Sequence, residues 1–290
     1  MLYVNDLPDI VKCGVKMFAD DTKIWNKVKD IGDKDRLQND LDNLDLWSSK
    51  WLLKFNVDKC KMMSLGHTLG TEYTLGGKVL QNTEEEKDLG VWISSNLKPS
   101  LQCSKAALKA KSVLACIKRT FSSITIDSFK ILFNTYIRPH IEYCVQVWNP
   151  FLKKDIEILE NVQRRATKMV KALGKMSYEE RLAKLKLFPL SYRRKRGDMI
   201  EVFKIMNGID NIDREAFFSD SVTKNLRGHS CKLYHRQVRL QLRQGFFSQR
   251  VVSLWNSLPQ FVVESTSVDM FKGRLDKFVF GSEVGTKNFI

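Results

Sequence analysis

The sequence has no long apolar run, no paired metal-binding cysteines and no internal repeats, and each absence excludes a class of protein. A membrane-spanning helix needs roughly eighteen or more consecutive apolar residues, and the chain has no such run. The amino-terminal segment MLYVNDLPD lacks the basic region and the long apolar core of a secretory signal. We therefore expect an intracellular protein, in the nucleus or the cytoplasm, with no membrane partner.

Cysteine is present, but not in the spacing of a zinc site or a disulfide framework. The six cysteines are scattered, and no two of them form a C-x-x-C pair. Such pairs are typical of zinc sites, and disulfide frameworks are typical of short secreted chains. The sequence therefore predicts reduced thiols, most of them buried.

Positive charge is what the chain has in excess, and it is unevenly distributed. The net charge is +15 over 290 residues, with −2 in residues 1–100, +13 in 101–200 and +4 in 201–290. A near-neutral module joined to a basic one indicates a polyanionic partner. The basic residues are interleaved with aromatic ones, which favours nucleic acid over a membrane surface. The alternative is a soluble basic protein without such a partner.

Hydrophobic periodicity predicts a β-rich first part and a helical remainder. Apolar runs at 14–19 and 22–28 predict a β-hairpin around Asp20-Asp21, and Gly76-Gly77 predicts a tight hairpin within 73–80. Leucines and tryptophans at three- and four-residue steps predict an amphipathic helix over 37–51. Single strands are predicted over 59–66 and 87–95. The predicted helices that follow are 101–121, 127–148 (kinked or split by Pro139), 155–173, 177–207 (interrupted by Pro189), 246–256 and 267–280.

A basic stripe lies along the predicted helix 155–173. Its members recur at i, i+4, i+7 and i+11, with one arginine beside them: Arg164, Arg165, Lys168, Lys171 and Lys175. Long cations on one helix face suit phosphate contacts, although a solvated helix face has the same pattern. A second cluster, RRKR at 193–196, includes Arg193 and Arg194 and fits either phosphate contacts or a nuclear-import signal.

The pair Asp20-Asp21 at the tip of the first predicted hairpin indicates metal chemistry. A tight turn holds two carboxylates together, and Mg²⁺ takes such oxygen ligands along with phosphate oxygens and water. In two-metal phosphoryl transfer, ions held in this way activate the attacking oxygen and stabilise the leaving one. Taken alone, an Asp-Asp pair is also typical of a solvated turn.

The surrounding sequence resembles the reverse transcriptases of non-LTR (LINE-type) retrotransposons, of the jockey-like clade. MFADDTKIW is similar to their active-site hairpin, motif C, and LYVNDLP to the segment before it. LQNDLDNLDLWSSKWLLKFNVDKCKMMSLG resembles motif D, and KDLGVWISSNLKPS resembles motif E. LFNTYIRPHIEYCVQVWNP, NVQRRATKMV and SYEERLAKLKLFPLSYRRKRGDMIEVFKIMNG resemble the thumb and connection. GFFSQRVVSLWNSLPQFVVESTSVDMFKGRLDKF resembles the C-terminal end, so the resemblance covers nearly the whole chain in the family's order.

The resemblance implies an α+β protein built around part of a right-hand polymerase. It implies a partial palm, a small antiparallel sheet with a packed helix, over 1–100, then a mostly α-helical thumb and connection over 101–208. A C-terminal helical module would cover 209–290.

The resemblance also assigns roles to three residues. Asp20 and Asp21 match the carboxylates that bind catalytic Mg²⁺ in this family. Lys59 matches the motif D lysine, which in such polymerases protonates the departing pyrophosphate; a surface lysine beside a strand is the alternative. The implied partner is RNA or an RNA/DNA template–primer duplex, with dNTP as the substrate of the intact enzyme.

A polymerase of this family needs parts that these 290 residues do not include. Its third palm carboxylate (motif A) and its fingers domain precede motif C, and too few residues precede the hairpin here to contain them. We therefore expect no polymerase activity from these residues alone, but residual nucleic-acid binding. Two alternatives stay open: a host-retained, non-catalytic nucleic-acid-binding or interaction module, and a truncated gene prediction for an active RNA-directed DNA polymerase.

Overall fold

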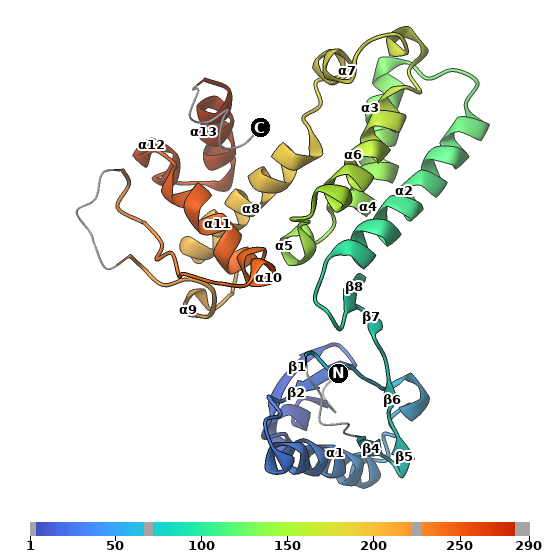
Figure 1. Cartoon of the computed structure of the whole chain (residues 1–290), viewed down its shortest axis with the longest axis vertical. Helices are drawn as coiled ribbons and strands as arrows, with labels where there is room; N and C mark the ends of the chain where they lie inside the picture. The colour runs from blue at the N-terminus through green and yellow to red at the C-terminus, as the bar shows by residue number, and fades with distance from the viewer. Residues whose placement is uncertain (1–3, 67–71, 222–227, 282–290) are drawn as a thin grey trace. The chain divides into compact units, whose positions relative to one another are not determined.

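The computed structural model describes residues 4–66, 72–221 and 228–281. It divides the chain into two compact units, Met1–Lys87 with Ser94–Leu97, and Asp88–Ile93 with Lys98–Ile290. We call these the small unit and the helical unit. The chain passes between them in the hairpin formed by β7 (Glu85–Asp88) and β8 (Val91–Ser94) (Figure 1). Within the described ranges, no helix is both long enough and apolar enough to cross a membrane.

The described part of the small unit contains one long helix and three short two-stranded ladders. Its elements are the 3₁₀ helix η2 (Leu7–Ile10), β1 (Gly14–Phe18), β2 (Asp21–Trp25), α1 (Ile31–Trp51), the 3₁₀ turn η3 (Val57–Lys59), β3 (Lys61–Met62), β4 (Thr74–Leu75), β5 (Lys78–Val79) and β6 (Gln81–Asn82). β1 pairs with β2 and β4 with β5 in antiparallel fashion, whereas β3 and β6 are parallel. The α+β class is confirmed, but the described strands form separate ladders rather than the one small antiparallel sheet that was predicted.

The core of the small unit is built on one face of α1. Leu41, Leu44 and Trp47 are buried in a cluster with Tyr73 and other apolar residues of the unit. This burial follows from their three- and four-residue spacing, which places them on one stripe of the helix. Trp51 continues that spacing but is exposed, so the buried face ends one turn before the helix does.

Residues with positive φ form the turns of two hairpins, one that the sequence predicts and one that it does not. Gly76 and Gly77 turn the chain between β4 and β5 with φ of 56° and 72°, values that glycine adopts without strain. The single strand predicted over 87–95 is wrong. Leu89 and Gly90 take φ of 44° and 87° there, and the segment turns into the hairpin of β7 and β8.

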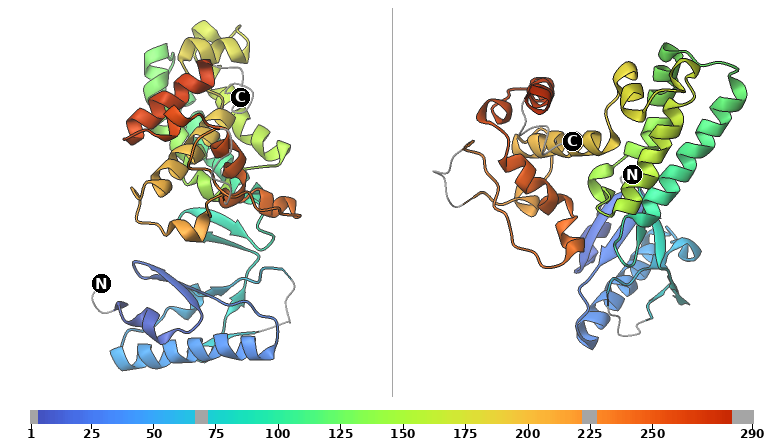
Figure 2. Two further views of the ribbon diagram at one scale, coloured as in Figure 1. Left: turned by 90° about the vertical axis from the view of Figure 1, so that its left-hand side faces the viewer. Right: turned by 45° about the horizontal axis from the view of Figure 1, so that its top comes forward.

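The described residues of the helical unit form two hydrophobic cores. Around the first lie α2 (Ser100–Thr120), α3 (Ile126–Leu132), the π-helical turn η4 (Phe133–Ile137), α4 (Arg138–Glu142), α5 (Val145–Trp148), α6 (Lys153–Thr167), the 3₁₀ turn η5 (Lys171–Leu173) and α7 (Tyr178–Leu185). Then follow α8 (Leu190–Met206), α9 (Arg214–Phe217), α10 (Gln241–Gln244), α11 (Phe247–Asn256), α12 (Gln260–Val263) and α13 (Val268–Gly281). Helices α2 and α6 lie along each other, and α8 packs against α11 and α13 (Figures 1 and 2). The segments predicted as thumb and C-terminal module therefore belong to one compact unit.

Prolines explain the helix breaks that the sequence predicts. Pro139 has no N–H to donate to the preceding turn, and the chain runs through the π-helical turn η4 just before it. Pro189 stands between α7 and α8. The chain leaves α8 at Asn207, and Gly208 takes a φ of 63°, as expected for a helix end.

The structure confirms one of the two predictions made for the cysteines, that their thiols are reduced. All six are free thiols. Only Cys103 is buried, however, so the expectation that most of them are buried is wrong.

Candidate metal hairpin and nucleic-acid interface

Asp20 and Asp21 lie at the tip of the hairpin of β1 and β2. Ala19 and Asp20 form the two-residue turn, with Ala19 at a φ of 56°, and Asp21 pairs with Phe18 as the first residue of β2. Both aspartates are exposed, and neither side chain forms a hydrogen bond or ion pair within the described residues. The hairpin thus presents two uncommitted carboxylates to solvent.

The two faces of this hairpin differ in character. One face contributes to the core of the small unit through Val15, Met17 and Ile24. The other face is exposed and carries two lysines directly opposite each other and two aromatic rings: Lys16, Lys23, Phe18 and Trp25. Phe18, next to the carboxylates, is 65% exposed.

The aspartate pair fits Mg²⁺ as an incomplete ligand set. Carboxylate oxygens are the hard donors that Mg²⁺ takes, and the ion commonly uses one or two of them together with water and phosphate oxygens. No group of three or more His, Cys, Asp or Glu side chains that could hold a metal occurs among the described residues. Asp20 and Asp21 would therefore hold an ion only with further ligands. Such an ion stabilises negative charge on phosphoryl oxygens.

Lys59 lies in the same unit as the hairpin. It is the last residue of η3 and is exposed. Within the described residues it makes no hydrogen bond or ion pair with Asp20 or Asp21. Its role as a proton donor stays a prediction.

Asp40, which the sequence reasoning missed, holds the start of the hairpin. This residue of α1 is 1% exposed, and its carboxylate accepts hydrogen bonds from the backbone N–H of Lys12 at 3.1 Å and of Cys13 at 2.7 Å. Burial raises the pKa of Asp40, but these hydrogen bonds outweigh it and hold the pKa below its usual value of 3.8. An acidic residue next to Leu41, on the apolar stripe of the helix, was the available signal.

The basic residues predicted to form one helical stripe do not share a helix. Helix α6 ends at Thr167, and Lys168 caps it, so Lys171 and Lys175 lie on the connection to α7. The helix ends here because Val170 and Leu173 are buried in the first core. Val170 is extended and the 3₁₀ turn η5 follows it, which brings both side chains into that core. The prediction of a helix through residue 173 is therefore wrong.

This connection instead produces a basic pocket, which we call the α6–α7 pocket. It has a volume of about 480 Å³, and none of the described residues that line it carries a carboxylate. The lining residues are Asn161, Arg164, Arg165, Lys168, Gly174, Met176, Ser177, Tyr178 and Arg181. The structure thus brings three of the predicted phosphate-binding residues together and adds Tyr178 and Arg181, whereas Lys171 and Lys175 lie outside the lining.

Arg181 gives the pocket a buried positive charge. The residue is 3% exposed, donates from Nε to Thr167 Oγ1 at 3.0 Å and from Nη1 to the Met176 carbonyl at 2.6 Å. It has no carboxylate within ion-pair distance among the described residues. Buried arginines are normally paired with an acid, so an anion in the pocket would be favourable here.

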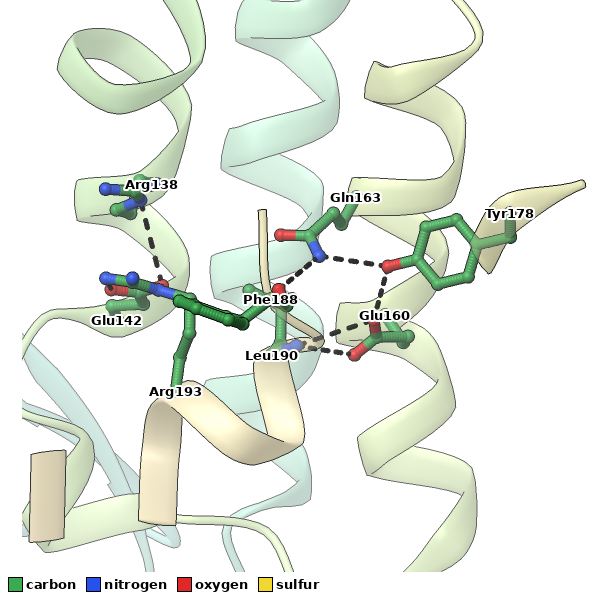
Figure 3. A network of polar contacts seen from close by, with 8 residues as sticks. All are labelled: Arg138, Glu142, Glu160, Gln163, Tyr178, Phe188, Leu190 and Arg193. Carbon is green, nitrogen blue, oxygen red and sulfur yellow. Dashed lines mark hydrogen bonds and ion pairs between the residues drawn. The ribbon is translucent and has the colours of Figure 1, made fainter. Parts of the chain in front are cut away.

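Tyr178 forms a fixed wall of the same pocket, and Figure 3 shows the hydrogen bonds of its hydroxyl. Its ring has the guanidinium groups of Arg164 and Arg181 at 5.1 and 5.7 Å from the ring centre. Its hydroxyl donates to the Glu160 carboxylate and accepts from Gln163 Nε2 at 3.0 Å. Burial, and then the Glu160 carboxylate, raise the pKa of Tyr178 above its usual value. The wall therefore stays neutral at physiological pH.

The arginines of the second predicted basic cluster, Arg193 and Arg194, are engaged within the fold. Arg193 forms a bidentate ion pair with Glu142, with Nε and Nη2 donating at 2.5 and 2.7 Å (Figure 3). Arg194 is 3% exposed, and its Nη1 is buried without a hydrogen-bond partner. Arg193 is thus engaged in an ion pair and Arg194 is buried, and their phosphate contacts stay a prediction.

A scan against protein-family models, a search of curated proteins and a search of solved structures each found no match to this chain.

Proposed function

We propose that the helical unit binds nucleic acid, with backbone phosphates of an RNA or RNA/DNA duplex in the α6–α7 pocket. The observation that carries this proposal is the buried Arg181 guanidinium, which has no acidic partner among the described residues and shares the pocket with Arg164, Arg165 and Lys168. Phosphate oxygens would compensate all four charges at once. Arginine is suited to this because its planar fork donates two parallel hydrogen bonds.

Charge distribution supports the same proposal. Residues 101–200 carry a net charge of +13, so a polyanion is attracted to the part of the chain that contains the pocket. Phosphate contacts of this kind read no base sequence, and binding would depend strongly on salt.

We further propose that this nucleic acid is a template–primer and that the chain is part of an RNA-directed DNA polymerase of the non-LTR type. Support comes from the sequence resemblance and from the exposed Asp20-Asp21 pair at a hairpin tip beside Phe18. Such a site would need a third carboxylate in addition to this pair. A non-catalytic nucleic-acid-binding module would use the same pocket but would not need the metal hairpin.

Salt-dependent binding tests the phosphate contacts. The chain is titrated into a labelled RNA/DNA duplex by fluorescence anisotropy at several salt concentrations. Lys168→Ala should weaken binding and lower the log–log salt slope by about one, because one phosphate contact is lost. Lys277→Ala, an exposed lysine of α13, is the matched control and should leave the slope unchanged. Equal slopes for the two variants, or a wild-type slope near zero, would contradict the proposal.

Metal binding tests the polymerase part separately. Mn²⁺ replaces Mg²⁺ as a paramagnetic probe, and NMR line broadening is followed in the complete chain. Broadening should concentrate at residues 18–22 and disappear in the double variant Asp20→Asn/Asp21→Asn. Asp58→Asn, at another exposed aspartate of the small unit, should leave the broadening in place. Broadening spread evenly over acidic surface residues would refute the metal hairpin while leaving the α6–α7 pocket untouched.

A further inference from the structure

A second pocket lies in the C-terminal part of the helical unit, and none of the sequence predictions points to it. We call it the α11 pocket. Its volume is about 750 Å³, within the roughly 300–1,000 Å³ typical of ligand sites. It is lined by His235, Gln237, Val238, Arg239, Gln244, Gln249, Arg250 and Ser253. The lining residues that the structure describes include cations and amides but no carboxylate.

Gln249 is the unusual member of this lining. Its side chain is on α11 and 8% exposed, and Oε1 is buried without a hydrogen-bond partner. Nε2 makes no hydrogen bond with the described residues either, and it is not among the buried atoms. Buried polar groups are nearly always hydrogen-bonded, so a buried, unpaired Oε1 next to an accessible, unpaired Nε2 points to a ligand that pairs with this amide.

Arg250 makes the neighbouring wall rigid. Its guanidinium donates to both carboxylate oxygens of Asp198 at 2.9 Å and to the carbonyls of Gly245 and Gln146 at 3.0 and 2.9 Å. These contacts neutralise its charge and fix the plane of the group. A fixed guanidinium plane is a surface on which a nucleobase can stack.

Arg239 leaves the pocket with an uncompensated charge. The residue is exposed and makes no ion pair within the described ranges. The pocket thus combines an open amide, a planar wall and a free cation. A nucleotide presents the matching groups, which are a base edge with adjacent donor and acceptor, a flat ring and a phosphate.

We propose that the α11 pocket binds one nucleotide, with the base edge on the Gln249 amide and the phosphate on Arg239. This nucleotide is either free or an unpaired unit of a single strand, since both present the same groups. The site differs from the α6–α7 pocket because it reads a base as well as a phosphate.

The test uses the complete chain with three probes: AMP, a labelled single-stranded RNA, and the same strand with abasic positions. Gln249→Leu replaces the amide by an apolar group of similar size. It should weaken binding of AMP or of the intact strand by about tenfold, the worth of one or two hydrogen bonds. The abasic strand should bind wild type and Gln249→Leu equally. Thermal unfolding should show no loss of stability, since the change removes an unsatisfied buried atom.

A second part of the test measures the contribution of positive charge by substituting two arginines of one segment. Arg239→Ala should weaken binding of the same probe, whereas Arg236→Ala, an exposed arginine outside the pocket lining, should not. If Gln249→Leu and Arg239→Ala bind AMP more weakly than wild type does, the ligand is a free nucleotide. If they bind only the intact strand more weakly, the ligand is single-stranded RNA. Wild-type affinity of Gln249→Leu for both probes, or equal losses on intact and abasic strands, would overturn the proposal.

Discussion

Replacing Asp40 with alanine removes the carboxylate that holds the residues just before β1. The change leaves the N–H groups of Lys12 and Cys13 without their partner. Gly14, the first residue of β1, follows directly, so the base of the hairpin that carries Asp20 and Asp21 should loosen. The small unit should keep α1, because alanine favours a helix.

The expected loss of stability depends on whether the N–H groups of Lys12 and Cys13 can hydrogen-bond to water after the substitution. Lys12 is exposed, so its N–H can be solvated after the substitution, whereas Cys13 is only partly exposed. A hydrogen bond to a charged group contributes about 1.5–3 kcal/mol, and the better helix propensity of alanine offsets about 0.5 kcal/mol. We expect Asp40→Ala to lower the stability of the small unit by about 2 kcal/mol, and Asp40→Asn by about half of that because one oxygen acceptor remains.

The pH dependence gives an independent check. Because the pKa of Asp40 is held below its usual 3.8 in the folded chain, its contribution is present above about pH 4. That contribution disappears as the pH falls through the lowered pKa. The difference in stability between wild type and Asp40→Asn should therefore shrink below about pH 4.

Hydrogen exchange measures this effect where it should occur. The amides of β1 and β2 are followed by mass spectrometry in the complete chain, and they should exchange about thirtyfold faster in Asp40→Ala, which corresponds to 2 kcal/mol. Asp45→Ala, at an exposed position of the same helix, is the control and should change little. Equal protection in the two variants would show that Asp40 does not hold the hairpin.

Two further predictions concern the helical unit. Tyr178→Phe removes the hydroxyl that donates to Glu160 and accepts from Gln163, and it should lower the free energy of unfolding in urea by about 2 kcal/mol. In a double-mutant cycle this loss should fall by about half on a Glu160→Gln background, which keeps one oxygen acceptor, and additive losses would argue against the network. Burial lowers the pKa of His229 below 6.5, so below that pH the unfolded chain takes up a proton that the folded chain does not. The melting temperature should therefore fall from pH 6.5 towards pH 5. His229→Gln should make the melting temperature less dependent on pH in this range, and an unchanged dependence would show that His229 does not cause it.

Local patterns in the sequence were sufficient for much of the secondary structure. The turn at Gly76-Gly77 and the helix from about residue 100 to 120 follow from glycine geometry and apolar spacing, which act over a few residues. The end of α6 did not follow from spacing, because Met169 and Leu173 continue the helical period beyond Thr167. The core requires Val170 and Leu173 to be buried, and this non-local requirement ends the helix.

The sequence by itself determined the excess of cations in residues 101–200 and the Asp20-Asp21 pair between two apolar runs. Only the tertiary structure decided which of these cations pair with an acid within the protein and which stay available to bind an anion. Arg193 meets Glu142 from 51 residues away, whereas Arg181 is buried beside Arg164 with no acidic partner among the described residues. Charge compensation depends on which side chains folding brings within a few ångströms, and no local pattern encodes that distance.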